Sequence, residues 1–431
     1  MKHIICCILF CVFFSASYGQ GDVYPGTWVM DASNLNGFSK IHLELKIAEG
    51  EKGVLFPAQL HFVAEDFNAT YQFLLAKKNA RELGISTQKY ALQEIPYSLG
   101  KLPELLNGTF DLSRDFKGSP ILSLLRLPLK STNIVLKSDS NLTNDQRKFQ
   151  KYLIQFFKEA EIQFSKQNSL PWQDDAVGAL LSGSFSPRYL GLKDTIMLPT
   201  RDGQFHLQSA KKSDVASITL NGGIQLDRFE LSKKLVNEEI LLDTGLNIVV
   251  FFIDEFGNNL PAKAKAQFVF GKQNSFLDFN NAVDSNATFI VQKFYCAHDK
   301  NKETQFQDFI PPKNEKTASS VADKIIGNIS SSSKKLTIAI WDDAVEDGDT
   351  ISIQLNGTWV AKGLPVKKQP QFISLDLVAG INAIVFVAEN LGSIAPNTSV
   401  IEIIDGKRRK SYLLETLIGD QNLLRINYEN R

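Results

Sequence analysis

The chain has 431 residues, of which 43% are hydrophobic and 22% charged, so it is long enough to bury several cores. Lys and Arg number 47, as do Asp and Glu, and the formal net charge is zero. A neutral chain lacks the field that draws proteins to nucleic acids or anionic membranes, and we exclude nucleic acid as a partner. This length predicts roughly two to four domains.

The first 19 residues have the pattern of a cleavable signal peptide. Lys2 supplies an early positive charge, an apolar run covers residues 4–14, and the small residue Gly19 precedes the expected cleavage site. We expect the mature chain to begin at Gln20, with no lipid on Cys11 and a periplasmic, extracellular or cell-surface location. The apolar run is too short to span a bilayer, so no transmembrane segment is predicted after signal removal.

Cysteine usage also bears on the compartment. Signal cleavage would remove three of the four cysteines and leave Cys296 alone, so the mature chain would have no disulfide framework. Secreted animal modules usually depend on disulfides, which favours a bacterial export route. Asn-x-Ser/Thr sequons would instead favour a eukaryotic glycoprotein, although such triplets arise freely in β proteins rich in Asn and Ser; they begin at Asn68, Asn107, Asn141, Asn286, Asn328, Asn356 and Asn397.

Residues 21–130 are predicted to form a small antiparallel β-barrel. Ile41, Leu43, Leu45 and Ile47 alternate with polar residues, as in a strand that is buried on one face. Several short strand-like runs follow, separated by Gly and Asn turns and without a long helix. This pattern favours an up-and-down barrel.

A connecting amphipathic helix is predicted within 141–168, beginning at a cap at Thr143 or Asn144. Its apolar face is wide, so we expect the helix to pack on a domain. Apolar side chains recur at helical spacing at Phe149, Leu153, Phe156 and Ala160.

An internal repeat dominates the rest of the chain. Residues 217–271 align without a gap on residues 352–406, with 14 identities in 55 positions. Two copies of one module are the natural interpretation. The repeat places β-sandwich domains at 190–298 and 335–431, joined by a linker at 299–334.

Each copy is predicted to be an immunoglobulin-like or jelly-roll-like sandwich. A short strand in each copy ends in Asn-Gly, at Asn221 and at Asn356, which is a strong tight-turn signal. Gly245 and Gly380 each begin an apolar run without alternation, as expected of a strand that is covered on both faces. The predicted fold is therefore mainly β.

The C-terminal copy carries the motifs Trp341-Asp342-Asp343, Asp347-Gly348-Asp349, Leu355-Asn356-Gly357, Gly380-Ile381-Asn382 and Glu389-Asn390-Leu391-Gly392-Ser393. On these motifs, residues 335–428 resemble the uncharacterised C-terminal β-sandwich domain of secreted proteins from Bacteroidetes. The resemblance implies an exported protein with a sandwich fold, and it implies no catalytic role.

The N-terminal unit is similar to lipocalin-type barrels. Gly26-Thr27-Trp28 gives the G-x-W entry to the first strand, and Arg126 lies near the last predicted strand. In that family an Arg packs over the Trp and closes the barrel floor. The similarity implies that Arg126 lies over Trp28 and that the barrel carries a small apolar ligand.

The densest acidic cluster is the candidate metal site, with Asp342, Asp343, Asp347 and Asp349 as ligands. Calcium is the expected ion, because hard cations require several oxygen ligands and closely spaced Asp residues in a Gly-containing loop supply them. Glu389 or Asn390 would reach in from a neighbouring loop. The alternative is a solvated hairpin loop, since acidic residues are common in turns for conformational reasons alone.

No pattern predicts catalysis. The mature histidines lack zinc-site spacing, no G-x-S-x-G motif or phosphate loop occurs, and Cys296 with His298 supplies too few metal ligands. The basic run 407–410 is expected to be a solvated hairpin turn.

We therefore expect a non-enzymatic envelope or extracellular protein whose β-sandwich modules bind a glycan, a cell-surface component or a protein partner. Trp341 and Trp359 are the exposed ligand-binding candidates. Two alternatives remain open: a carrier of a small apolar ligand in the barrel, and a hydrolase whose catalytic groups are too scattered to recognise. A hollow barrel would favour the carrier, and exposed aromatic platforms would favour glycan binding.

Overall fold

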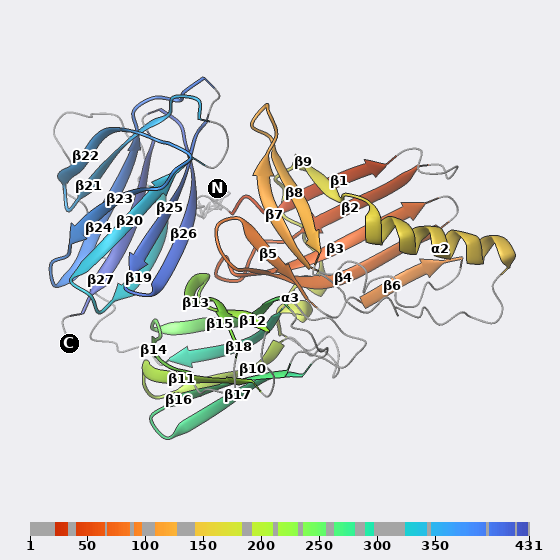
Figure 1. Ribbon diagram of the computed structural model, residues 1–431, viewed down its shortest axis with the longest axis horizontal. Coiled ribbons are helices and arrows are strands. Elements are labelled where there is room, and N and C mark those ends of the chain that lie inside the picture. The colour runs from red at the N-terminus through yellow and green to blue at the C-terminus, as the bar shows by residue number, and fades with distance from the viewer. Residues whose placement is uncertain are drawn as a thin grey trace, which may run out of the picture.

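The structure is a computed structural model, and in it the chain is mainly β, with three units (Figure 1). The signal-peptide range and Asp343 lie outside the described residues. Within the described residues there are two helices, and neither is long and apolar enough to cross a membrane. The described residues are 22–32, 40–64, 67–86, 90–96, 108–126, 143–182, 192–209, 214–231, 236–255, 263–280, 289–296, 324–342, 346–393, 396–418 and 420–429.

The N-terminal unit is an eight-stranded antiparallel barrel. Its strands follow the order β3-β2-β1-β9-β8-β7-β5-β4, and pairing of β3 with β4 closes it. A further strand, β6, lies beside β4. The bounds are β1 Gly26–Ala32, β2 Ile41–Ile47, β3 Leu55–Ala64, β4 Phe67–Lys77, β5 Glu82–Ile85, β6 Tyr90–Ile95, β7 Gly108–Arg114, β8 Pro120–Arg126 and β9 Gln163–Asn168.

The barrel core follows the predicted alternation. On β2, Ile41, Leu43, Leu45 and Ile47 are buried and the residues between them are half-buried. These side chains belong to one apolar cluster that draws on every barrel strand. Large aromatic rings dominate this cluster, namely Tyr24, Trp28, Phe56, Phe62, Phe67, Tyr71, Phe73, Phe110 and Phe164.

Trp28 of the G-x-W motif is fully buried on β1, and its indole nitrogen donates to the Tyr24 carbonyl at 2.8 Å. The described cation over its ring is Lys166 of β9, with Nζ 5.3 Å from the ring centroid. Burial lowers the pKa of Lys166 to about 8. The side chain of Arg126, for which the lipocalin similarity implied this contact, lies outside the described residues.

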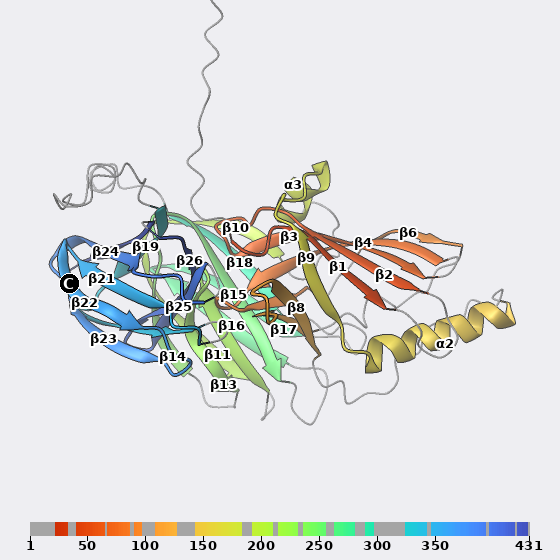
Figure 2. The ribbon, with the colours of Figure 1, turned by 90° about the horizontal axis from the view of Figure 1, so that it is seen from above.

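Helix α2 (Asn144–Glu159) begins where the sequence predicts. Thr143 caps it: its hydroxyl accepts from the Gln146 amide at 3.2 Å, and the Gln146 side chain accepts from the Thr143 amide at 2.9 Å. Phe149 and Phe156 are buried in the barrel core, which confirms that α2 packs on a domain. Figure 2 shows α2 alongside the barrel and far from the C-terminal sandwich.

Two predicted boundaries are wrong. The barrel does not end within 21–130, because its closing strand β9 follows α2 and pairs with both β1 and β8. Only Phe164 and Ile162 are buried around this strand, so its sequence lacks the apolar alternation that would have revealed it. The predicted linker 299–334 contains β19, which runs parallel to β27 in the C-terminal sandwich.

Each sandwich copy has a five-stranded and a four-stranded sheet. Copy 1 consists of the sheets β10-β18-β15-β12-β13 and β14-β11-β16-β17, and copy 2 consists of β19-β27-β24-β21-β22 and β23-β20-β25-β26. The bounds in copy 1 are β10 Leu192–Leu198, β11 Asp202–Ser209, β12 Val215–Leu220, β13 Gly223–Glu230, β14 Val236–Leu241, β15 Gly245–Glu255, β16 Lys263–Phe270, β17 Gln273–Asn280 and β18 Phe289–Cys296. Those in copy 2 are β19 Lys324–Ser331, β20 Lys335–Trp341, β21 Thr350–Leu355, β22 Thr358–Pro365, β23 Gln371–Asp376, β24 Gly380–Ala388, β25 Asn397–Asp405, β26 Arg408–Thr416 and β27 Gln421–Tyr428.

The two copies share one topology, as the repeat predicts, and the match extends to single hydrogen bonds. Asn221 and Asn356 both have φ of 50° in their Asn-Gly turns, where a left-handed conformation is required. Each donates its side-chain amide at 3.0 Å to a buried asparagine, Asn247 in copy 1 and Asn382 in copy 2.

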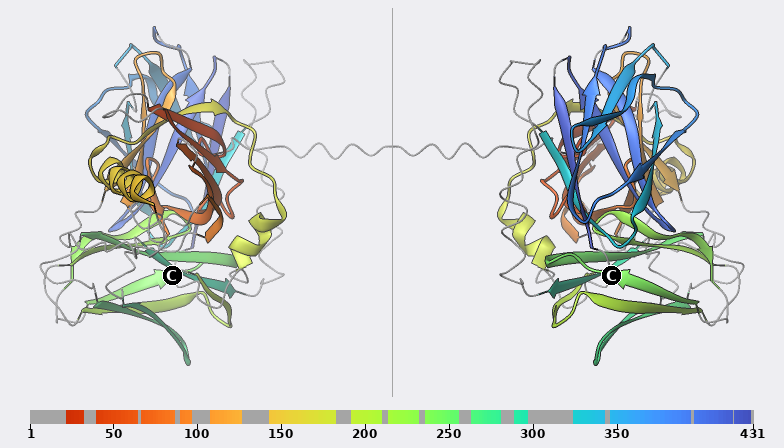
Figure 3. Two further views of the ribbon diagram at one scale, coloured as in Figure 1. Left: turned by 90° about the vertical axis from the view of Figure 1, so that its right-hand side faces the viewer. Right: turned by 90° about the vertical axis from the view of Figure 1, so that its left-hand side faces the viewer.

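The outer face of the five-stranded sheet of copy 1 packs on the barrel wall, where Ile248, Val250 and Phe252 join one apolar cluster with Leu55 and Leu74. Helix α3 (Asp175–Ser182) adds to this cluster. Figure 3 shows copy 1 lying below both the barrel and copy 2. Salt bridges cross the same boundary, with nitrogen–oxygen distances of 2.7 Å in Lys78–Asp254 and 2.5 Å in Lys293–Glu51.

Candidate functional site

The predicted acidic loop lies at one end of copy 2, between β20 and β21. Asp342 and Asp349 are buried, at 3% and 2% exposure, and Asp347 is half-buried. Asp343 lies outside the described residues. Within the described part of the chain, no group of three or more His, Cys, Asp or Glu side chains is arranged to hold a metal ion. Calcium binding by this loop stays a prediction.

Asp349 has an unusual electrostatic environment. Burial raises the pKa of this carboxyl to about 6, the hydrogen bond from the Thr398 amide (2.9 Å) opposes the rise, and the nearby Asp347 and Asp342 add to it. Its other oxygen, Oδ1, is buried without a hydrogen bond. The Asp349 side chain therefore titrates far above the range of an ordinary aspartate.

The Glu389-to-Ser393 motif holds this loop in shape. The Asn390 side chain accepts from the Thr350 amide at 2.7 Å and donates to the Gly348 carbonyl at 2.9 Å. Gly392 has φ of 57°, and a Cβ there would lie 2.3 Å from Asp347 Oδ1. Asn390 thus reaches the acidic loop as predicted, but it does so through main-chain contacts, which indicate a conformational role.

The two candidate tryptophans lie apart. Trp341 is half-buried at the end of β20, beside the acidic loop. Trp359 is 37% exposed at the start of β22, opposite Gln354 and next to the Asn-Gly turn at the other end of β21. Lys362 Nζ lies 5.2 Å from the centroid of the Trp359 ring. The structure therefore does not bring the predicted ligand-binding residues into one site.

The repeat allows the environment of Trp359 in copy 2 to be compared with that of the equivalent residue in copy 1. Its counterpart in copy 1, Ile224, is 6% exposed because it pairs with Arg409 on β26 of copy 2. Every residue of β22 is exposed or half-buried, whereas β13 begins with two buried residues. One edge is thus covered in copy 1 and open in copy 2.

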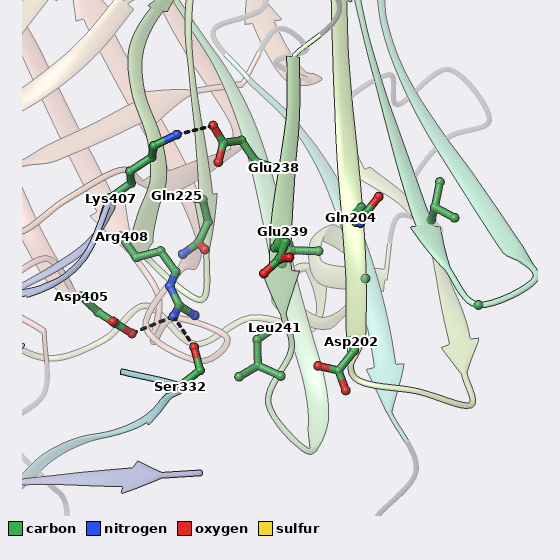
Figure 4. A pocket seen from close by; sticks show the side chains of 14 residues that line it. Asp202, Gln204, Gln225, Glu238, Glu239, Leu241, Ser332, Asp405, Lys407 and Arg408 are labelled. Atoms are coloured by element: carbon green, nitrogen blue, oxygen red, sulfur yellow. Dashed lines mark hydrogen bonds and ion pairs between the residues drawn. The ribbon is translucent and has the colours of Figure 1, made fainter. Parts of the chain in front are cut away.

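Sequence reasoning missed a pocket of about 630 Å³ between the two sandwiches (Figure 4). The walls are polar and include both members of two ion pairs. Lys407 Nζ lies 2.8 Å from a Glu238 oxygen across the boundary, and Arg408 lies 2.7 Å from Asp405. Further polar walls are Asp202, Gln204, Gln225, Glu239 and Ser332.

Lys407 lies in the turn between β25 and β26, as predicted, but residues 408–410 already belong to β26 and the run is not simply solvated. Besides the ion pairs of Lys407 and Arg408, burial lowers the pKa of Lys410 to about 8. The run therefore contacts copy 1, through the Lys407–Glu238 ion pair and the pairing of Arg409 with Ile224. The sequence of a charged run does not indicate which distant residues it will contact, so the contact between residues 407–410 and copy 1 could not be predicted from it.

The other predicted chemical groups have structural partners. His42, His61 and His206 hydrogen-bond across strands, with nitrogen–oxygen distances of 2.8, 3.0 and 2.6 Å to Asp31, Asn68 and Asn237. Cys296 is a free, buried cysteine whose thiol pKa is raised by burial. His298 lies outside the described residues.

The barrel interior bears on the carrier alternative. Bulky rings fill it, among them Trp28, Phe56 and Phe62, each fully buried. The α2 side chains join the same cluster, with the rings of Phe67 and Phe149 centred 6.3 Å apart. Side chains packed in this way occupy the volume inside the barrel that an apolar ligand would need.

Comparison with known proteins adds no identity. No family model matches the chain, and no curated protein matches it. Among solved structures, an anti-sigma factor domain-containing protein is 12% identical and covers 50% of this chain and 78% of its own, with a TM-score of 0.15. The secreted serine protease VesC from Vibrio cholerae is 8% identical and covers 92% and 98%, with a TM-score of 0.14. Likeness at this level supports no statement about fold or function.

Proposed function

We propose that the chain is an exported, non-enzymatic binding protein that engages a protein partner along strand β22 of its C-terminal sandwich. One observation carries this proposal: Ile224 on β13 is covered, whereas its repeat counterpart Trp359 on β22 is open. An open edge strand offers backbone N–H and C=O groups for pairing, and an exposed aromatic ring adds apolar contact.

Three further features support the proposal over its rivals. The signal-peptide pattern of residues 1–19 favours export. The packed barrel favours a structural unit over a carrier. Lys362 already lies over the Trp359 ring, where a sugar would need to stack, and this favours a protein partner over a glycan.

Site-specific photo-crosslinking in the producing cell tests the proposal. A benzophenone amino acid at Val360, which is 37% exposed on β22, should yield covalent adducts with a protein that mass spectrometry identifies. The matched control position is Phe372, which is 66% exposed on β23 of the same sandwich and should yield few adducts.

Equal adducts from both positions would contradict a specific β22 edge. So would an absence of protein adducts at Val360 combined with cosedimentation on insoluble polysaccharide that Trp359→Ala abolishes. In that second outcome the glycan alternative would replace the proposal.

A further inference from the structure

The two sandwich copies are joined within the chain through sheet edges. Strand β13 of copy 1 lies antiparallel to β26 of copy 2, with Ile224 opposite Arg409. The approach is close: a Cβ on Gly223 would lie 3.3 Å from the Lys410 Cβ and 3.4 Å from the Arg409 carbonyl oxygen. The five-stranded sheet of copy 1 thereby continues into the four-stranded sheet of copy 2.

The repeat leaves the counterparts of both edges open. Strand β22 of copy 2 corresponds to β13, and β17 of copy 1 corresponds to β26. Among the described residues, β22 pairs only with β21, and β17 pairs only with β16. Figure 1 shows these two open edges on different flanks of the molecule.

Side chains at the open edges fit the same register. Trp359 takes the place of Ile224, and Asn274 takes the place of Arg409. Thr358 replaces Gly223 and therefore adds a side chain where space is tightest. Ser275 replaces Lys410 but keeps the Cβ that lies 3.3 Å from the Gly223 position, so the paired strands would lie a few tenths of an ångström further apart than β13 and β26 do.

The part of β22 that is free to pair with another strand also matches the part of β13 that pairs with β26. The pairing of β13 with β12 is interrupted by register shifts at the β12 residues 216–219, and β13 pairs with β26 near its start, at Ile224. The pairing of β22 with β21 is interrupted at the equivalent β21 residues 351–354, and Gly363 of β22 has φ of 56°. The segment 358–360 is thus the counterpart of the part of β13 that forms the internal joint.

We infer that β22 of one molecule pairs with β17 of a second copy of this chain, with Trp359 opposite Asn274, repeating between chains the joint that β13 and β26 form within one. The inference rests on the proposed function and names its partner. Because two different surfaces meet, the contact is head-to-tail, and unless the rotation closes a ring it extends into a linear assembly. Without a covalent tether, the association depends on protein concentration.

Sedimentation of the purified mature chain over a concentration series tests the inference. Wild type should show an average mass that rises with concentration, and Trp359→Glu should shift the dissociation toward higher concentration. Adding Asn274→Lys to Trp359→Glu should restore association by about two- to fivefold, because opposite charges then face each other across the strands. Adding Asn274→Glu instead should weaken it further.

Phe372→Glu is the matched control, since it places the same charge on an exposed aromatic position of another edge. Circular dichroism spectra equal to wild type establish that each variant is folded. A wild-type mass that stays monomeric, an equal effect of Phe372→Glu, or a failure of Asn274→Lys to restore association would each overturn the inference. Crosslinking of Val360 to a different, identified protein would overturn it too while leaving the proposed function standing.

Discussion

Two buried asparagines hold equivalent turns in the two sandwich copies. The Asn382 amide donates to the carbonyls of Val378 and Gly380 at 2.7 and 3.1 Å, and its oxygen accepts from the Val378 amide and from Asn356 at 2.9 and 3.0 Å. Asn247 makes the same set of contacts in copy 1. Aspartate could not replace it without losing the donors, which accounts for asparagine at both positions.

Substitution of Asn382 by Ala should therefore be costly. It leaves three part-buried main-chain groups of Val378 and Gly380 without these partners, and the expected loss in unfolding free energy is about 3 kcal/mol. Chemical denaturation of the mature chain measures this loss. Thr358→Ala, on the exposed strand β22, should change stability by less than about 0.5 kcal/mol; similar losses for both variants would refute the role assigned to Asn382.

The raised pKa of Asp349 predicts a specific pH dependence. The folded state holds this proton more tightly than the unfolded chain, whose pKa is near 3.8, so the stability from protonated Asp349 is complete below about pH 3.8 and is lost as pH rises through about 6. Asp349→Asn stays neutral throughout. The variant should gain up to roughly 3 kcal/mol relative to wild type between pH 4 and pH 7.5. A stability difference that does not change with pH would contradict the burial argument.

Calcium would act on the same carboxyl in the opposite direction. If the acidic loop binds Ca²⁺, the ion at a hundredfold excess over its dissociation constant stabilises the folded state by about 2.7 kcal/mol. Wild type should then melt higher in millimolar calcium than in chelator, and the Asp347→Asn, Asp349→Asn double variant should not. Identical melting of wild type in both conditions would leave these residues as parts of a hairpin loop.

At the scale of elements, helix α2 is part of the barrel rather than a connector. Its boundary and its packing face were predictable, because the cap at Thr143 and the spacing of Phe149 and Phe156 are local properties. The strand after it was not predictable. Phe164 is the only apolar residue of β9, and the sequence around it resembles a loop. Which strands a polar segment pairs with depends on distant residues.

Phe156→Ala tests whether α2 belongs to the core. The side chain is 4% exposed within the barrel cluster, so its truncation should cost about 3–5 kcal/mol and lower the melting temperature of the barrel. Lys151→Ala, on the exposed face of the same helix, is the control and should change little. Calorimetry distinguishes the two results, and equal effects would show that α2 is dispensable for barrel packing.

At the scale of the whole molecule, the sequence indicates the two copies but not how they meet. The repeat, the Asn-Gly turns and the apolar strands can all be predicted from the sequence, since each depends on the spacing of residues along the chain. The contacts between units are single side chains from distant positions, such as Arg201 to Glu429 at 3.0 Å and Lys407 to Glu238. No sequence pattern in either segment predicts which residue of the other unit it will contact.

The Lys78–Asp254 pair should couple the barrel to copy 1. Both side chains are less than 10% exposed, and Asp254 also accepts from Ser217 at 2.6 Å. Lys78→Met leaves the Asp254 carboxylate buried without its cation and should cost about 3–5 kcal/mol. The Lys78→Met, Asp254→Asn double variant should recover much of this loss in denaturation measurements. Full additivity of the two single losses would show that the pair is not coupled.

In each of the three units the first strand pairs with the last: β1 with β9, β10 with β18 and β19 with β27. This arrangement constrains when each unit can complete its fold as the chain emerges from its N-terminal end. No unit can complete its sheet until its final strand has emerged, at residues 168, 296 and 428. Until then each unit has an unpaired strand edge, so we expect the risk of wrong pairing to be greatest just before each final strand emerges.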